Sequence, residues 1–170
     1  AGLAAAYFLA RGGVKVTVFE KEARMGGVVR NVIPGFRISD EAIDNDVKIV
    51  AAMGVEMVNG KEITSIDELK KEYDYIVLAV GASDKGTLKL EAGDTMNALD
   101  FLAQFKATDG KLDLGKNVVV IGGGNTAMDT ARAAKRNAGV EKVSLVYRRT
   151  RRFMPADEEE LVMAMEDGVE

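Results

Sequence analysis

Cysteine and histidine are both absent from this 170-residue chain. Without cysteine, the chain can form no disulfide, no thiolate nucleophile and no cysteine-ligated metal cluster. Without histidine, it can build no Ser-His-Asp triad, no histidine-bound metal site and no imidazole acid–base catalyst. Any chemistry must therefore be carried by something other than the usual side chains, and a bound cofactor is the first candidate.

Long apolar runs and a strong charge excess are missing as well. No run approaches the roughly 18 apolar residues that a membrane span requires. The 27 Asp+Glu against 23 Lys+Arg give a formal net charge of only −4. Proline is scarce, with 2 residues, whereas glycine is plentiful, with 18. A cysteine-free, mildly acidic chain favours a cytoplasmic location, although a secreted protein without disulfides would share the same absence.

Helical and strand periodicities alternate along the chain. We expect strands at 15–19, 55–58, 75–80, 117–121 and 143–147, and helices at 1–13, 41–53, 65–73, 97–105, 126–138 and 155–168. The run 75–80 is continuously apolar, which is typical of a strand buried on both faces of a sheet, and 117–121 is expected to be a second buried strand. This alternation predicts an α/β, Rossmann-like fold with a mostly parallel sheet covered by helices.

Several helix starts carry recognisable signals. Ser39 or Asp40 is expected to cap the second helix, and Ser65 with Glu68 has the spacing of a capping box. Pro155 suits the first position of the last helix. The first helix has no preceding strand, and the last two residues resemble the start of a strand. We therefore expect a fragment of a longer protein, incomplete at both ends.

The strongest functional signal is the run VVVIGGGNTAMD at 118–129. It leads from a predicted strand through Gly122 and Gly124 to Ala127 in a helix, which is the GxGxxA form of the dinucleotide fingerprint. Gly122 allows the tight turn, Gly124 lets the backbone approach a pyrophosphate, and the helix N-terminus presents free N–H groups to phosphates. The alternative is a purely structural turn that binds nothing.

The residues after the next strand indicate which nucleotide is bound. A unit selective for NAD places an acidic residue there, whereas this chain has Arg148, Arg149, Arg151 and Arg152. Guanidinium groups suit a 2′-phosphate, so the sequence favours NADP over NAD. A solvated basic loop is the alternative. A nucleic-acid patch is disfavoured because the chain is acidic and no aromatic residues interleave with the arginines.

A second glycine turn is only half present, at the start of the chain. Gly2 opens a helix of small residues, and Glu20 follows the next strand at close to the roughly 20 residues expected for a ribose-binding acid. Gly2 would then be the third glycine of a fingerprint. An acid at this place favours a free ribose 2′-hydroxyl, as in FAD or NAD, unless Glu20 is an ordinary residue at a strand end.

Several segments together carry a family resemblance: Glu20-Lys21, Gly26-Gly27, Arg30, IPGFR at 33–37, the VIGGGNTAMD run, and YRRTRRFMPADEEE at 147–160. They resemble the NADPH-dependent glutamate synthase small (beta) subunit family of FAD oxidoreductases. The flavin part of dihydropyrimidine dehydrogenase and selenate reductase-like subunits belong to the same group. The resemblance spans essentially the whole chain. It implies a flavoprotein that passes a hydride from NADPH to FAD, and electrons onward to an iron–sulfur cluster or partner subunit outside this chain.

The resemblance also implies which residues bind each cofactor. On the FAD side these are Gly2, Leu3, Glu20, Lys21, Gly27, Val28, Arg37 and Ile63, with Gly81 at the crossing toward the second domain. On the NADPH side they are Gly122, Gly123, Gly124, Asn125 and Thr126 for the phosphates, and Arg148, Arg149 and Arg152 for the 2′-phosphate. No catalytic side chain and no metal ligand is implied. Asp129 is readily explained as a first-turn acid favoured by the helix dipole.

The implied domain organisation has three parts. Residues 1–107 form a partial FAD-binding domain without its first strand, 108–116 a linker, and 117–170 a partial NADPH-binding domain. We expect the fragment by itself to be inactive and to bind FAD poorly. Two other functions remain open: a dinucleotide-binding domain that senses NADP(H) without turnover, and an NADP-dependent dehydrogenase that acts directly on a small substrate. The latter needs an acid–base residue that the sequence does not offer.

Overall fold

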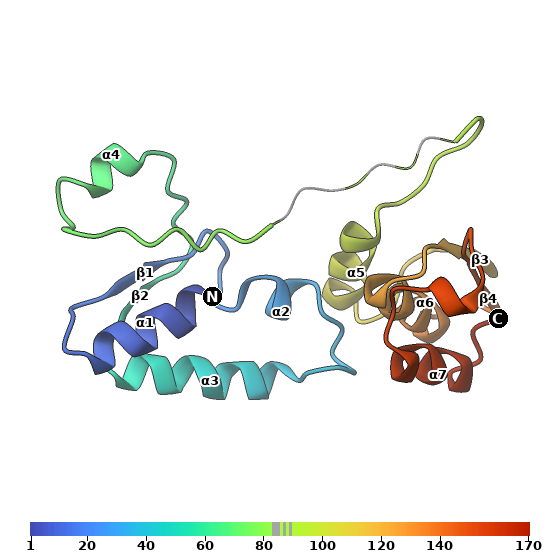
Figure 1. Ribbon diagram of the computed structural model, residues 1–170, viewed down its shortest axis with the longest axis horizontal. Coiled ribbons are helices and arrows are strands. Elements are labelled where there is room, and N and C mark those ends of the chain that lie inside the picture. Colours follow the sequence, from blue (N-terminus) through green and yellow to red (C-terminus); the bar gives the residue numbers. More distant parts are fainter. Residues whose placement is uncertain (83–85, 87, 89) are drawn as a thin grey trace. The chain divides into compact units, whose positions relative to one another are not determined.

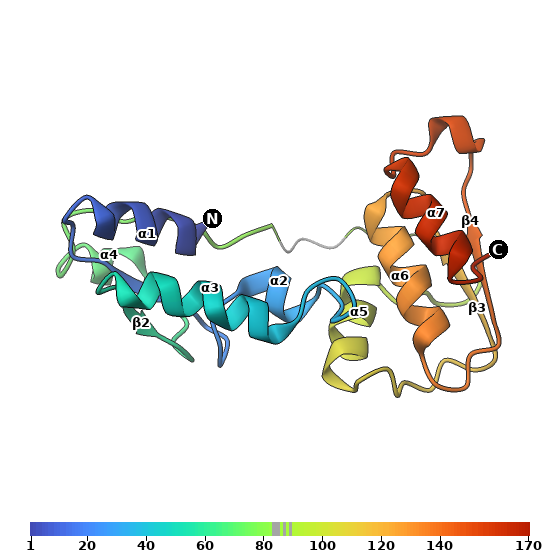
Figure 2. The same ribbon diagram turned by 90° about the horizontal axis from the view of Figure 1, so that it is seen from below.

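The computed structural model describes residues 1–82, 86, 88 and 90–170. The chain forms two compact units, one made of Ala1–Arg30 with Ile38–Ser83 and the other of Asn31–Arg37 with Asp84–Glu170. Each unit contains a two-stranded parallel sheet and its own helices (Figures 1 and 2). In the described part of the chain, no helix is both long and apolar enough to cross a bilayer.

The first unit is built on strands β1 (Thr17–Phe19) and β2 (Glu56–Val58), which pair in parallel with Val18 opposite Met57. Helix α1 (Gly2–Arg11) contacts both β1 and helix α3 (Asp40–Ala52). The shared core is small and consists of Ala6, Val50 and Val55 with their partly buried neighbours. Two short helices complete the unit, α2 (Gly27–Asn31) and α4 (Ile66–Leu69).

The second unit is built on strands β3 (Asn117–Ile121) and β4 (Lys142–Val146), which pair in parallel with Ile121 opposite Val146. Helix α6 (Asn125–Arg136) joins the two strands, and helices α5 (Ala98–Ala107) and α7 (Glu158–Glu166) pack against it (Figure 2). A short 3-10 helix, η1 (Arg151–Phe153), lies between β4 and α7.

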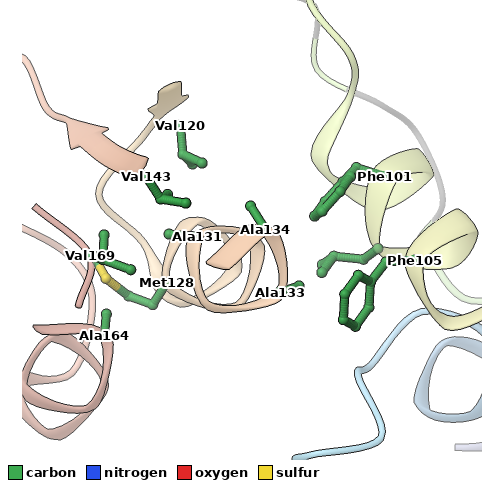
Figure 3. Packing of buried hydrophobic residues seen from close by; sticks show 11 residues of the cluster. Phe101, Phe105, Val120, Met128, Ala131, Ala133, Ala134, Val143, Ala164 and Val169 are labelled. Carbon is green, nitrogen blue, oxygen red and sulfur yellow. The ribbon is translucent and has the colours of Figure 1, made fainter. Parts of the chain in front are cut away.

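The core of the second unit surrounds α6, whose buried face is lined by alanines (Figure 3). Met128, Ala131 and Ala133 are fully buried, as is Val143 of β4. In Figure 3, Phe101 and Phe105 of α5 lie on one side of α6, and Val120, Val143, Ala164 and Val169 lie on the other. Alanine at these positions lets the helix approach its neighbours closely, so any larger side chain would have to displace them.

Most of the predicted elements are confirmed, together with the helix cap expected at Ser39. The Ser39 hydroxyl accepts a hydrogen bond from the Ala42 N–H at the start of α3. The Asn97 side chain accepts one from the Leu99 N–H at the start of α5. The last residues, expected to begin a strand, do hydrogen-bond to β4: the Glu170 carbonyl accepts from the Leu145 N–H.

The predicted strand at 75–80 is wrong. Tyr75 is 91% exposed and Val80 is 88% exposed, and the segment forms no strand. A continuous apolar run is buried only where a neighbouring strand and covering helices surround it, and no described strand hydrogen-bonds to this one. Strand β3 likewise exposes one face, since Val119 is 62% exposed and Ile121 is 55% exposed.

Two helix starts also differ from the prediction. Helix α7 begins at Glu158, after Asp157, so Pro155 lies outside it. Asp157 has an extended backbone (φ −62°, ψ 142°), and just before it the Ala156 N–H donates to the Gly123 carbonyl. At α4 the Ser65 side chain makes no capping hydrogen bond, and the helix comprises only the four residues Ile66–Leu69.

The compact units have other boundaries than the predicted domains. Helix α5 and the segment 108–116 both belong to the second unit. Leu112 and Leu114 pack against its core, and the Asn137 side chain both donates to the Leu112 carbonyl and accepts from the Leu112 N–H. A segment expected to be a polar linker is therefore packed and hydrogen-bonded to the end of α6.

Candidate nucleotide-binding site

The glycine turn of the second unit, residues 122–124, connects β3 to α6. The Gly122 N–H donates to the Val146 carbonyl, which fixes the turn beside the end of β4. A Cβ atom on Gly122 would lie 2.9 Å from the Cβ of Ala127, a distance that real side chains do not tolerate. The first glycine and the alanine of the fingerprint are therefore needed together for the strand to meet its helix this closely.

At Gly123, a different neighbour leaves no room for a side chain. A Cβ atom there would lie only 2.6 Å from Cδ2 of the Tyr147 ring, which comes from the end of β4. A Cβ atom on Gly124 would meet nothing closer than the Pro155 Cγ, at 3.9 Å. The tyrosine thus covers one side of the glycine turn, a contact that the sequence pattern alone does not reveal.

Four backbone N–H groups at the turn are free to bind an anion. Those of Gly123, Gly124, Asn125 and Thr126 have no acceptor among the described residues. They lie at the N-terminus of a 12-residue helix, where the helix dipole adds positive partial charge. Free donors and a backbone without side chains fit the pyrophosphate of a dinucleotide.

The arginine loop, residues 148–152, follows Tyr147 directly. Arg148, Arg149 and Arg152 are exposed and form no ion pair within the described part of the chain. Arg151 differs, because its guanidinium pairs with the Glu158 carboxylate at the start of α7. Three guanidinium groups therefore remain available beside the glycine turn, and they are the three that the sequence predicts as 2′-phosphate ligands.

Two hydrogen-bonded contacts tie the segment after the arginine loop to the glycine turn and the start of α6, and a third joins the two ends of the loop to each other. The Tyr147 hydroxyl donates to the Phe153 carbonyl at 2.9 Å, and the Ala156 N–H donates to the Gly123 carbonyl at 3.0 Å. Asn125 and Asp157 form a reciprocal pair, described further below. Sequence reasoning missed Tyr147 and Asp157, although both lie in the YRRTRRFMPADEEE segment that carries the family resemblance.

Arg37 lies in the second unit, in an ion-pair cluster with two carboxylates. Its Nε donates to Asp129 Oδ1 at 2.5 Å, and its Nη1 donates to Glu160 Oε1 at 2.6 Å. The hydrogen bond from Arg37 holds the pKa of Glu160 below its usual value. The sequence predicts Asp129 in the first turn of α6. It lies in the second turn, where it pairs with Arg37. The predicted contact of Arg37 with FAD stays a prediction.

In the first unit, the predicted FAD residues lie at two places. Gly2 begins α1, and a Cβ atom on it would lie 3.3 Å from that of Ala79, two residues before Gly81. Glu20 follows β1, and its carbonyl accepts from the Lys61 N–H, two residues before Ile63. Leu3 contributes to the core, whereas Lys21 and Val28 are exposed.

The turn before α2 is held by a buried arginine. The Arg30 Nε donates to the Met25 carbonyl at 2.5 Å, and its Nη2 donates to Asp44 of α3 at 2.6 Å. These bonds fix Gly26 and Gly27 against α3.

A helix N-terminus at Gly2 and an acid after β1 fit the phosphate and the ribose of a nucleotide.

Known proteins of similar sequence match the whole length of this chain. The family model described as pyridine nucleotide-disulphide oxidoreductase matches residues 1–170. The protein YgfK of Escherichia coli K12 is 51% identical over 176 residues, covering 100% of this chain and 17% of YgfK. The glutamate synthase (NADPH) small chain of Azospirillum brasilense is 35% identical over 191 residues, covering 100% of this chain and 39% of that protein. The chain thus spans well under half the length of these relatives.

A solved structure shows the same fold. FprA from Mycobacterium tuberculosis in complex with NADPH superposes with a TM-score of 0.76 at 22% identity, covering 96% of this chain and 44% of FprA. The predicted resemblance to glutamate synthase small subunits and the predicted Rossmann-like fold are both confirmed.

Proposed function

The chain belongs to the pyridine nucleotide-disulphide oxidoreductase family, and we propose that it is the nucleotide-binding part of an FAD-dependent oxidoreductase that uses NADPH. In this proposal it delivers electrons to an iron–sulfur domain or partner subunit, as in the glutamate synthase small-subunit type. The observation that carries the proposal is the placement of three unpaired arginines in the loop that follows Tyr147, whose ring covers the glycine turn.

Each part of the second unit has a role in binding NADPH. The free N–H groups of residues 123–126 hold the pyrophosphate, and the absence of a side chain at Gly124, where a Cβ would meet only Pro155 at 3.9 Å, lets the backbone approach it. Arg148, Arg149 and Arg152 hold the 2′-phosphate, because guanidinium groups form paired, charge-assisted hydrogen bonds with phosphate oxygens. The second unit would then be the NADPH-binding part of the protein.

The first unit would hold FAD. Gly2 and Leu3 lie at a helix N-terminus suited to its pyrophosphate, and Glu20 after β1 suits the ribose hydroxyls. Lys21, Gly27, Val28 and Ile63 would line the site, with Gly81 at the crossing between units. When bound, FAD supplies the redox chemistry, accepting a hydride and releasing single electrons. The side chains of this chain bind and orient the two nucleotides, and none is proposed as an acid or base.

The nucleotide preference is tested by replacing Arg148 and Arg149 with alanine in the intact protein. We expect the affinity for NADPH to fall by about tenfold or more, because hydrogen bonds to charged groups contribute about 1.5–3 kcal/mol each, while the affinity for NADH stays unchanged. Lys142→Ala, which removes one positive charge from the other end of β4, is the matched control. Equal losses for NADPH and NADH would overturn the 2′-phosphate assignment.

The flavin part of the proposal has its own test. The purified intact protein should show flavin absorbance, and NADPH should bleach it. A colourless protein that takes up no FAD would contradict the proposal. NADPH binding without any turnover would instead support a sensing domain, and flavin-free reduction of a small substrate would support a direct dehydrogenase.

A further inference from the structure

We propose that Asn125 and Asp157 are positioning residues that hold the arginine loop in place for the 2′-phosphate of NADPH. The Asn125–Asp157 pair then acts as a clasp, by which we mean a contact that joins the start of α6 to the segment after the arginine loop. Asn125 binds phosphate only through its backbone N–H. This inference rests on the proposed function, because it assigns a role in NADPH binding. It adds to that function a specificity-determining contact between a variable position of the fingerprint, Asn125, and a residue outside both the fingerprint and the arginine loop, Asp157.

The pair uses the whole side-chain amide of Asn125. Its Nδ2 donates to Asp157 Oδ2 at 2.9 Å, and its Oδ1 accepts from the Asp157 backbone N–H at 3.0 Å. The direction of the amide is determined by its partners, because a backbone N–H needs an acceptor and a carboxylate needs a donor. Both ends of the amide are therefore engaged away from the phosphate position, in a geometry that only asparagine or a close relative can reproduce.

The clasp acts on the arginine loop because it joins the segment after the loop to the glycine turn. Tyr147, immediately before the loop, lies over Gly123. Ala156, shortly after it, donates to the Gly123 carbonyl, and Asp157 pairs with Asn125. The loop is thus anchored at both ends to the element that would hold the pyrophosphate. Fixing a loop before the ligand arrives reduces the ordering cost of binding, which raises affinity without adding a ligand contact.

Variants of Asp157 distinguish a role in positioning the loop from a purely electrostatic role. Its carboxylate is negatively charged and lies next to the N-terminus of α6, so charge alone would oppose phosphate binding there. Asp157→Asn removes the charge but keeps an oxygen that can accept from Asn125 Nδ2, and the backbone N–H is unchanged. Asp157→Ala removes both the charge and the acceptor. A clasp predicts that the first variant binds like the original and that the second binds more weakly.

The experiment measures NADP⁺ and NAD⁺ binding to the intact protein by titration calorimetry. We expect Asn125→Ala to lose about tenfold in NADP⁺ affinity, since two hydrogen bonds are removed, with NAD⁺ affinity within about twofold. Asp157→Ala should lose about threefold for NADP⁺, and Asp157→Asn should stay within about twofold of the original. Limited trypsin digestion gives a second readout, because a released arginine loop should be cut faster in Asn125→Ala than in Asp157→Asn.

Each outcome decides the question. Equal losses of NADP⁺ and NAD⁺ in Asn125→Ala would show a direct pyrophosphate contact and overturn the clasp. Unchanged binding and unchanged trypsin cleavage would overturn it as well. If Asn125→Ala fails to fold, as judged by circular dichroism, the comparison between the two Asp157 variants decides instead. Failure of the original protein to bind either nucleotide would refute the proposed function, which is a different result from any of these.

Discussion

Gly123→Ala tests how tightly the glycine turn is packed. The added Cβ would lie 2.6 Å from Tyr147 Cδ2 and 2.8 Å from its Cε2, well inside van der Waals contact. The ring cannot move aside without breaking the hydrogen bond from its hydroxyl to the Phe153 carbonyl. The substitution should therefore either displace Tyr147 or shift the turn, and both changes disturb the region where we place the NADPH phosphates.

Two effects of opposite sign determine the magnitude. Overpacking of this kind typically costs about 1–3 kcal/mol. Gly123 does not have a positive φ, so alanine is compatible with its backbone and should gain about 0.4–1 kcal/mol by restricting the unfolded chain. The steric term is larger, and we expect a net loss of about 1–2 kcal/mol in the free energy of unfolding, measured by urea denaturation of the intact protein.

Gly124→Ala is the matched control, because its Cβ would meet only Pro155 Cγ, at 3.9 Å. The loss of a favourable N-cap residue should roughly cancel the gain from the unfolded state. Removing the ring should relieve the clash, so Gly123→Ala should cost little when introduced into Tyr147→Ala. Equal stability of the two glycine variants, or an undiminished cost of Gly123→Ala without the ring, would refute the packing argument.

Three further predictions concern other parts of the structure. Because Arg37 lowers the pKa of Glu160 below its ordinary 4.5, this carboxylate should stabilise the fold above that pH and lose its contribution as the pH falls further. Glu160→Gln should therefore weaken the acid dependence of urea unfolding, and an identical dependence would contradict the ion pair. Arg30→Ala should destabilise by about 2 kcal/mol, since it removes a charge-assisted bond to Asp44 and a bond to the Met25 carbonyl; thermal unfolding would test this, with the exposed Arg11→Ala as control. Met128→Ala should cost about 2–5 kcal/mol and Met128→Leu less than about 1.5 kcal/mol in urea unfolding, and a similar cost for both would argue against close packing around α6.

Local signals in the sequence were sufficient where the structure depends on neighbours within a few residues. The cap at Ser39 is such a case, because its side chain reaches a backbone N–H three residues away. The glycine turn is another, since the close approach of Gly122 and Ala127 follows from their spacing alone. For the same reason the alternation of strands and helices was enough to predict the Rossmann-like fold.

Tertiary contacts account for the parts that the sequence could not predict. Pro155 has the residue type for a helix start, but α7 begins only after Asp157, in a segment whose Ala156 N–H is hydrogen-bonded to the distant Gly123. Asp129 has the charge expected of a first-turn acid, but its position is explained by Arg37, which lies 92 residues away in the chain. The run 75–80 has the composition of a buried strand, and composition cannot say whether a partner strand is present.

The pairing of arginines with carboxylates would explain how a chain with a net charge of −4 could form the proposed site for an anion. In the second unit, several arginines are neutralised locally: Arg37 by Asp129 and Glu160, Arg132 and Arg136 by Asp167, and Arg151 by Glu158. The same is not true of Arg148, Arg149 and Arg152, which have no carboxylate partner among the described residues. Screened charges contribute little at a distance, so a phosphate near the glycine turn would be governed by these three guanidinium groups and the N-terminus of α6. The selectivity for a 2′-phosphate would thus arise from which arginines are left unpaired, rather than from how many the chain contains.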